Sequence, residues 1–226
     1  MPANPPLNSS NPSTKQKQDI PITIAVEGLG KKFNREWIFR DMNYTFQGGQ
    51  THAITGPNGS GKSTLLQILW GQMPPSLGTV RYTRASGEVN ADDIYKNIAI
   101  VAPYLDIIDE FTLLEQLKFH FKLKTPRNGM TYVEMLEIMN MKQAQDKYIS
   151  NFSSGMRQRV KLALAFFSNA DIFFLDEPGT NLDNQSFNWY QEQLRNLPSH
   201  ALILIASNQA SEYPTDARKL DIIRFR

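Results

Sequence analysis

The sequence has no cysteine, no long apolar run and almost no net charge. Without cysteine, disulfide bonds and thiolate metal ligands are excluded. No apolar run approaches the roughly 18 residues that a membrane-spanning helix needs, and the longest runs are LALAFF (162–167) and ALILIA (201–206). A formal net charge of +2 on 226 residues is too small to indicate a nucleic-acid partner. These absences fit a cytosolic protein that binds no nucleic acid.

What remains is the composition of a folded, globular chain. Hydrophobic residues make up 41% of it and charged residues 20%, and 226 residues suit one domain with an inserted subdomain. Residues 1–19 are rich in proline, asparagine and serine and have no apolar segment. We therefore expect a disordered tail there rather than a secretory signal, and a folded domain over residues 20–226.

The hydrophobic pattern predicts strands that alternate with helices. Strands are expected at 22–29, 42–46, 51–55, 80–83, 97–102, 172–176, 201–206 and 222–225. Helices are expected from near Lys62, within 111–150, at 151–167, at about 184–196 and near 209–213. Such alternation indicates a largely parallel sheet that is covered on both faces. The helices between about 104 and 168 interrupt it, and we expect them to form an inserted helical subdomain.

The stretch GPNGSGKST (56–64) lies between an expected strand and an expected helix, and it matches the phosphate-binding pattern G-x-x-x-x-G-K-[ST]. Glycines let the backbone wrap a polyphosphate closely, so that successive N–H groups and the helix start face its negative charge. The lysine can reach the β- and γ-phosphate oxygens, and the next serine can bind Mg²⁺. A flexible turn is the alternative, but the flanking strand and helix argue against it. The candidate binding residues are Gly56, Pro57, Asn58, Gly59, Ser60, Gly61, Lys62, Ser63 and Thr64.

A second motif, IFFLDEP (172–178), is a buried strand that ends in two carboxylates. Asp176 would lie at the carboxyl end of the strand, where open α/β sheets bind ligands, and would help Ser63 to hold Mg²⁺. Glu177 could accept a proton from an attacking water. The alternative is a core strand followed by a solvated acidic turn, which the nearby phosphate-binding pattern disfavours.

A third segment, NFSSGMRQRVKLALA (151–165), resembles the signature of the ATP-binding cassette ATPases, the nucleotide-binding subunits of ABC transporters. That signature is usually written LSGGQ and is followed by a basic Arg-Gln-Arg-Val helix. Its five places are taken here by Phe152, Ser153, Ser154, Gly155 and Met156. By itself, the segment would be an ordinary amphipathic helix with a serine cap. The resemblance runs from about Ile22 to Arg226.

The resemblance implies an α/β fold of the P-loop NTPase, ABC-type ATPase class. Its parts are a mixed or parallel sheet core, an N-terminal antiparallel β subdomain and the inserted helical subdomain. ATP and Mg²⁺ are the implied ligands, and Lys62 and Glu177 take catalytic places. Phe33 matches the aromatic residue that stacks on adenine, with a plain turn aromatic as the alternative. Asp183 takes the acidic place in the loop after the glutamate.

The resemblance also implies a second ATPase subunit, either another copy of this chain or a different one. Ser153, Ser154, Gly155 and Met156 would face the γ-phosphate bound by that subunit, since the start of a helix attracts anions. ATP would then draw the two subunits together, and hydrolysis would let them separate.

Three positions depart from the family pattern. Pro103 stands where the family has a glutamine that touches Mg²⁺ and the attacking water, and a proline side chain can do neither. Asn208 stands where a histidine lies near the γ-phosphate; asparagine can donate a hydrogen bond there but carries no charge. The signature itself has Ser154 for glycine and Met156 for glutamine. The chain either hydrolyses ATP slowly through Glu177 or binds it with hardly any turnover, and the intact glutamate favours hydrolysis.

The leading hypothesis is the ATP-hydrolysing subunit of an ABC transporter, peripheral on the cytoplasmic face of a membrane. It would dock on a separate transmembrane permease through the helical subdomain, especially Tyr104 to Phe121, while cargo and direction belong to that partner. One alternative is a soluble ABC-type ATPase that acts on ribosomes or DNA, which the lack of a basic patch disfavours. The other is a nucleotide-binding regulator with little turnover, which Pro103 and Asn208 keep open.

Overall fold

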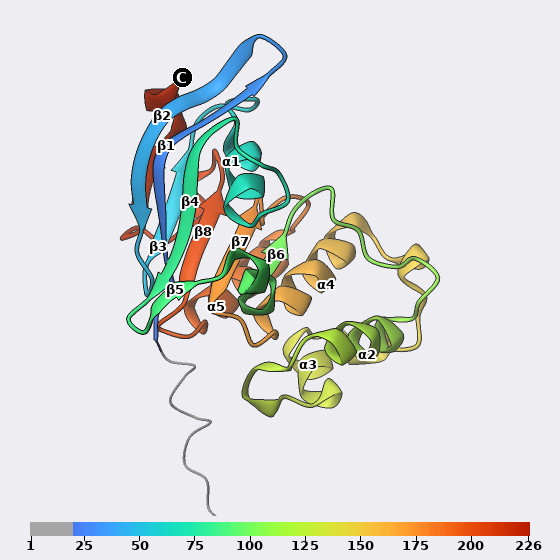
Figure 1. The fold of residues 1–226 in the computed structure, drawn as a ribbon. Helices are drawn as coiled ribbons and strands as arrows, with labels where there is room; N and C mark the ends of the chain where they lie inside the picture. Colours follow the sequence, from blue (N-terminus) through green and yellow to red (C-terminus); the bar gives the residue numbers. More distant parts are fainter. Residues whose placement is uncertain (1–19) are drawn as a thin grey trace, which may run out of the picture.

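The computed structural model describes residues 20–226, which form two β-sheets and the helices around them (Figure 1). The tail expected at residues 1–19 lies outside the described residues. One sheet is antiparallel with four strands and the other is parallel with five, which confirms the fold class inferred from the sequence. Within residues 20–226, no helix is both long and apolar enough to cross a membrane.

The antiparallel sheet has the strand order β2-β1-β4-β5. Its strands are β1 (Thr23–Phe33), β2 (Glu36–Phe46), β4 (Leu77–Arg84) and β5 (Gly87–Val89). β1 and β2 form a hairpin whose tip projects beyond the rest of the sheet (Figure 1). Both strands are longer than the sequence pattern predicts, because backbone pairing continues through charged residues such as Lys32, opposite Trp37, and Glu36, opposite Phe33.

The parallel sheet has the strand order β6-β7-β8-β3-β9. Its strands are β3 (Thr51–Thr55), β6 (Ile98–Val101), β7 (Ile172–Asp176), β8 (Leu202–Ala206) and β9 (Arg218–Asp221). The strand predicted at 222–225 is wrong: Ile222–Phe225 is a 3-10 helix, and the edge strand precedes it. Leu220 is the one buried residue of β9, so this edge strand shows no apolar alternation in the sequence.

The central strands of the parallel sheet are buried on both faces. Ile172 and Phe174 of β7 lie in one core with the first helix and the antiparallel sheet. Phe173 and Leu175 of β7 lie in a second core on the opposite face. All four side chains are fully buried, and each burial of this kind contributes about 1.5–3 kcal/mol. The covering helices are α1 (Lys62–Leu69) on one face and α4 (Ser154–Phe166) and α5 (Asn184–Arg195) on the other.

Two further helices, α2 (Leu113–Leu123) and α3 (Tyr132–Ile138), lie beyond α4, away from both sheets (Figure 1). Each begins with a capping box, formed by Thr112 with Glu115 and by Thr131 with Glu134. These boxes satisfy backbone N–H groups that a helix leaves free at its start, so the two short helices have defined beginnings.

Two predicted helices start or end differently in the structure. The helix expected at 151–167 begins only at Ser154, because Ser153 is its N-cap and accepts a hydrogen bond from the Met156 N–H. The short helix expected near 209–213 is a 3-10 turn over Ala210–Glu212.

His52 on β3 joins the parallel sheet to the end of β2. Its ring is fully buried, with Nε2 3.1 Å from the Gln47 N–H nitrogen and Nδ1 3.2 Å from the Tyr44 hydroxyl oxygen. Because Nε2 accepts the Gln47 hydrogen bond, it carries no proton and the ring is neutral. Burial lowers the pKa of His52 to about 4.

We expect the protein to lose stability as the pH falls from 6.5 to about 4, because the unfolded chain then binds a proton at His52 that the folded chain excludes. The stabilising effect of the neutral ring is present above that window. His52→Gln cannot be protonated and should flatten the fall in the urea unfolding midpoint across it. Equal pH slopes for the variant and the wild type would contradict this role of His52.

Candidate active site

The glycine loop connects the end of β3 to the start of α1. Gly56, Gly59 and Gly61 have φ angles of 146°, 76° and 100°, a backbone region that side chains disfavour. At Gly61 a Cβ atom would lie only 2.3 Å from Cγ2 of Ile38. The loop therefore requires glycine for its own conformation, and its course brings residues 56–61 around the start of α1.

Lys62 is buried inside the bend of this loop. Its side chain is 4% exposed, and Nζ donates hydrogen bonds to the carbonyl oxygens of Gly56 at 2.9 Å and Pro57 at 3.1 Å. These bonds fix the positive charge of Lys62 next to the loop N–H groups and the helix start. All three features attract an anion to the same place. The sequence prediction for Lys62 and the glycine loop is therefore consistent with the local geometry.

Asp176 ends β7 with a carboxylate that has no hydrogen-bond partner. The residue is 1% exposed, and neither carboxylate oxygen has a partner at normal distance. Burial raises the pKa of Asp176, while the nearby Ser63 hydroxyl and the charge of Lys62 oppose that rise. An uncompensated buried carboxylate is costly, and Mg²⁺ prefers oxygen ligands. Asp176 and Ser63 therefore fit a magnesium site.

Glu177 follows in a strained backbone conformation. Its φ is 47°, which is uncommon for a residue other than glycine and is typical of functional sites. Its N–H donates to the Ala206 carbonyl oxygen at 2.9 Å, and Nε2 of Gln158 on α4 donates to the Pro178 carbonyl oxygen, also at 2.9 Å. These bonds from β8 and α4 hold the turn that aims the glutamate.

Glu177 lines a small cavity of about 160 Å³. Pro103 lies in the same lining, so the proline and the predicted base face one cavity. Lys161 also lines it, and its Nζ lies 3.5 Å from the Pro103 carbonyl oxygen and 3.3 Å from an Asp106 carboxylate oxygen.

Asn208 contacts the glycine loop, and its role near the γ-phosphate stays a prediction. Its Nδ2 donates a hydrogen bond to Oδ1 of Asn58 at 2.9 Å. The residue follows β8, and Asp176 ends β7 beside it, so both come from the carboxyl edge of the parallel sheet. Ligands bind at this edge in open α/β sheets.

The signature residues form the start of α4. Oγ of Ser153 accepts from the Met156 N–H at 3.2 Å, and a Cβ atom on Gly155 would lie 2.8 Å from the Asn181 carbonyl oxygen. Ser153, Ser154, Gly155 and Met156 line a hollow of about 610 Å³ that includes no residue of the glycine loop. The chain thus places these four residues together in one hollow, and Ser154 also lines the cavity of Glu177.

Two other predicted residues have clear local surroundings. Asp183 caps α5, since its Oδ1 accepts from the Ser186 N–H at 2.7 Å. Phe33 ends β1 with its ring 45% exposed and Nζ of Lys31 5.2 Å from the ring centroid. An exposed ring at a hairpin end suits stacking, and the role of Phe33 stays a prediction.

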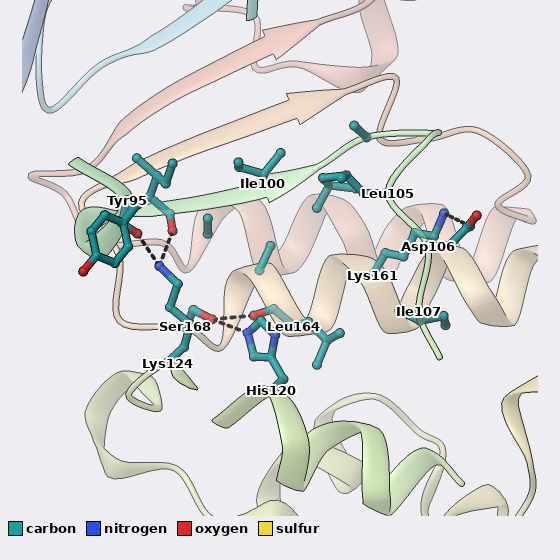
Figure 2. A pocket seen from close by; sticks show the side chains of 15 residues that line it. Tyr95, Ile100, Leu105, Asp106, Ile107, His120, Lys124, Lys161, Leu164 and Ser168 are labelled. Atoms are coloured by element: carbon teal, nitrogen blue, oxygen red, sulfur yellow. Dashed lines mark hydrogen bonds and ion pairs between the residues drawn. The ribbon is translucent and has the colours of Figure 1, made fainter. Parts of the chain in front are cut away.

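A separate apolar hollow of about 360 Å³ lies between β6, α2 and α4 (Figure 2). Lys124 lies at one end, where its Nζ donates to the Tyr95 carbonyl oxygen at 2.6 Å and to that of Ile98 at 3.0 Å. Lys161 and Asp106 lie at the other end. The lining between them is mostly aliphatic: Ile98, Ala99, Ile100, Val101, Ala102, Leu105, Ile107, Leu164 and Ala165.

Sequence reasoning missed the surroundings of Tyr104. We expected this residue to belong to the docking surface, and that stays a prediction. Tyr104 does not line the apolar hollow, whereas Leu105 and Ile107 do. The Tyr104 phenol is in polar contact with Gln67 of α1 and within the field of Asp176. Burial raises its pKa, so the phenol is neutral. No signal in the sequence linked Gln67 to this contact.

The comparison with known proteins agrees with this geometry. A sequence model described as ABC transporter matches residues 39–180, which is more than half of the chain. The chain belongs to the ABC transporter family. Nod factor export ATP-binding protein I of Rhizobium johnstonii is 26% identical over 195 residues, which are 85% of this chain and 63% of that protein. An uncharacterized ABC transporter ATP-binding protein of Bacillus subtilis is 26% identical over 208 residues, which are 89% of this chain and 66% of that one. The chain therefore spans less than two thirds of the length of these relatives.

Solved structures of the family share the fold. A putative ABC transporter ATP-binding protein from Pyrococcus furiosus superposes with a TM-score of 0.75 at 18% identity, covering 90% of this chain and 98% of that one. A bacterial Atm1-family ABC exporter with ATP bound gives a TM-score of 0.69 at 20% identity, covering 85% of this chain and 35% of the exporter. At these identities the similarity shows that this chain shares the fold of those structures.

Lys62→Ala should weaken binding of Mg-ATP at least about 10-fold, because a hydrogen bond to a charged group contributes about 1.5–3 kcal/mol. Isothermal titration calorimetry measures the affinity directly. Lys118→Ala, an exposed change on α2, is the matched control and should leave the affinity unaltered. If the Lys62→Ala variant binds as tightly as the wild type, Lys62 does not belong to the phosphate site.

Proposed function

We propose that this chain is the ATP-binding and ATP-hydrolysing subunit of an ABC transporter, acting with a separate membrane-spanning permease. The observation that supports this most directly is the buried Lys62 inside the glycine loop beside the buried, unpartnered carboxylate of Asp176. One feature suits a phosphate chain and the other suits the cation that accompanies it.

Substrate binding in this proposal begins with the glycine loop. Its N–H groups, the start of α1 and Lys62 hold the phosphates, while Ser63 and Asp176 hold Mg²⁺, and Phe33 stacks on the adenine. When bound, Mg²⁺ neutralises charge on the phosphate oxygens. Lys62 would exchange its hydrogen bonds to Gly56 and Pro57 for phosphate oxygens.

Hydrolysis in this proposal is the attack of a water oxygen on the γ-phosphorus. The bond from that phosphorus to the β–γ bridging oxygen breaks, ADP leaves, and Glu177 accepts the proton of the water. Asn208 donates a neutral hydrogen bond to the γ-phosphate, so it stabilises developing charge less than a cation would. With Pro103 unable to orient water, we infer a modest turnover.

A second ATPase subunit completes the site in this proposal. The hollow of Ser153–Met156 includes no glycine-loop residue, which supports a role toward nucleotide on another chain. The start of α4 presents N–H groups there, a favourable position for a γ-phosphate. The partner is either a second copy or a related chain.

The apolar hollow beside β6 is the proposed docking site for the permease. It lies between β6 and the helical subdomain that we place at about residues 104–168, and it is lined mainly by aliphatic side chains. Lys161 lines both this hollow and the cavity of Glu177. A permease segment seated there would therefore touch a residue that also contacts the active site, on the cytoplasmic face of the membrane.

Glu177→Gln should lower the rate of phosphate release at least about 100-fold, the usual contribution of a general base, while Mg-ATP still binds. A coupled phosphate-release assay measures the rate, and Glu88→Gln, an exposed change on β5, is the control. Equal rates in Glu177→Gln and wild type would favour the nucleotide-binding regulator and end the assignment of Glu177 as base.

Leu105→Asp should abolish association with the permease, because it places a charge in the apolar hollow. Co-purification with membrane proteins from cells that express the tagged chain measures the association, and a co-purifying multi-span protein is the expected partner. Val133→Asp changes another exposed apolar residue, on α3 outside the hollow, and should leave co-purification intact. If Val133→Asp abolishes co-purification and Leu105→Asp does not, the docking site lies outside the hollow.

A further inference from the structure

Glu212 is a buried carboxyl beneath the catalytic turn that the mechanism above does not use. The residue is 1% exposed and ends the 3-10 turn Ala210–Glu212. Its Oε1 accepts a hydrogen bond from the Gly179 N–H at 3.2 Å, and its backbone carbonyl accepts one from the Tyr190 hydroxyl at 2.6 Å. Oε2 has no partner at normal distance, although the Ser207 hydroxyl lies close enough to lower the pKa.

Gly179 permits this contact. A Cβ atom at that position would lie 2.4 Å from Oε1 of Glu212, which is far inside contact distance. Gly179 follows Glu177 by two positions in the same turn, where the Thr180 N–H donates to the Glu177 carbonyl oxygen at 3.2 Å. The carboxylate of Glu212 therefore bonds directly to the turn that carries the proposed base.

The segment from Asn208 to Glu212 contacts the glycine loop at its first residue. Asn208, four positions earlier, bonds to Asn58, and the Glu212 N–H donates to the Gln209 carbonyl oxygen at 3.1 Å. The Gln209 N–H in turn donates to Oγ of Ser207 at 2.9 Å. A short segment held by its own hydrogen bonds thus touches the phosphate-binding loop at one end and the catalytic turn at the other.

The charges of the active site reach this carboxyl. Burial raises the pKa of Glu212, and the negative charges of Glu177 and Asp176 raise it further. Burying a carboxyl group this close to two other acidic side chains costs free energy, so its position calls for a functional explanation.

We propose that Glu212 is a positioning residue that holds the turn of Glu177 in register with the glycine loop. This inference rests on the proposed role of Glu177 as base. Oε1 accepts the Gly179 N–H and so maintains the strained φ of Glu177, and the segment back to Asn208 ties that turn to the loop that holds the phosphates. Glu212 itself is buried and does not line the cavity of Glu177. Its loss displaces the base without removing any group that binds ATP.

The test compares two substitutions of similar size. Glu212→Met removes the acceptor, and we expect the turnover number to fall about 10–100-fold, since a small misplacement of a catalytic group has an effect of this order. Affinity for Mg-ATP, measured by calorimetry, should stay within about 2-fold of wild type because the glycine loop is intact. Glu212→Gln keeps an oxygen acceptor for Gly179 and should restore most of the turnover. Glu192→Met, an exposed change on α5, is the control.

Gly179→Ala gives an independent test that leaves Glu212 in place. The added methyl group separates the carboxylate from the backbone N–H, so turnover should fall while Mg-ATP affinity is retained, even if Glu212→Met fails to fold. Wild-type turnover in Glu212→Met or in Gly179→Ala would overturn the inference, as would a parallel loss of turnover and affinity in a folded variant. If instead Glu177→Gln itself turned over like wild type, the assignment of the base would fail, which is a separate outcome.

Discussion

Asp176 has both carboxylate oxygens buried and unpaired at the end of a strand that is buried on both faces. Such a group is stable only if nearby charge or a cation compensates it. A positive charge lies nearby on Lys62, but that ammonium is bonded to carbonyl oxygens of the glycine loop. The end of β7 and the start of α1 therefore belong to one electrostatic site. A metal ion would compensate the charge of Asp176, and a polyanion bound to that ion would compensate the charge of Lys62.

The surrounding elements hold this site from several sides. Gln158 of α4 bonds to the turn after Glu177, Ala206 of β8 bonds to its backbone, and Asn208 bonds to the glycine loop. Each of these contacts joins segments that are distant in sequence. The proposed base, the phosphate-binding loop and the start of α4 are thus connected through hydrogen bonds, which tolerate little displacement.

Much of the fold and of the site could be predicted from the sequence because its signals are local. The glycine pattern at 56–64 and the buried run of β7 depend only on neighbouring residues, and both lie where expected. The edge strand β9 escaped prediction because its polar residues pair through the backbone alone. Glu212 and Gln67 escaped because their contacts come from distant segments, and nothing in their own neighbourhood marks them.

α1 is enclosed between the two sheets, with Leu65, Leu66 and Leu69 fully buried in the core that both sheets share. The helix that ends the glycine loop is consequently ordered before any nucleotide arrives. A helix start that is already formed loses little conformational entropy when it binds a phosphate. Enclosure of one helix between two sheets thus preorganises the anion site.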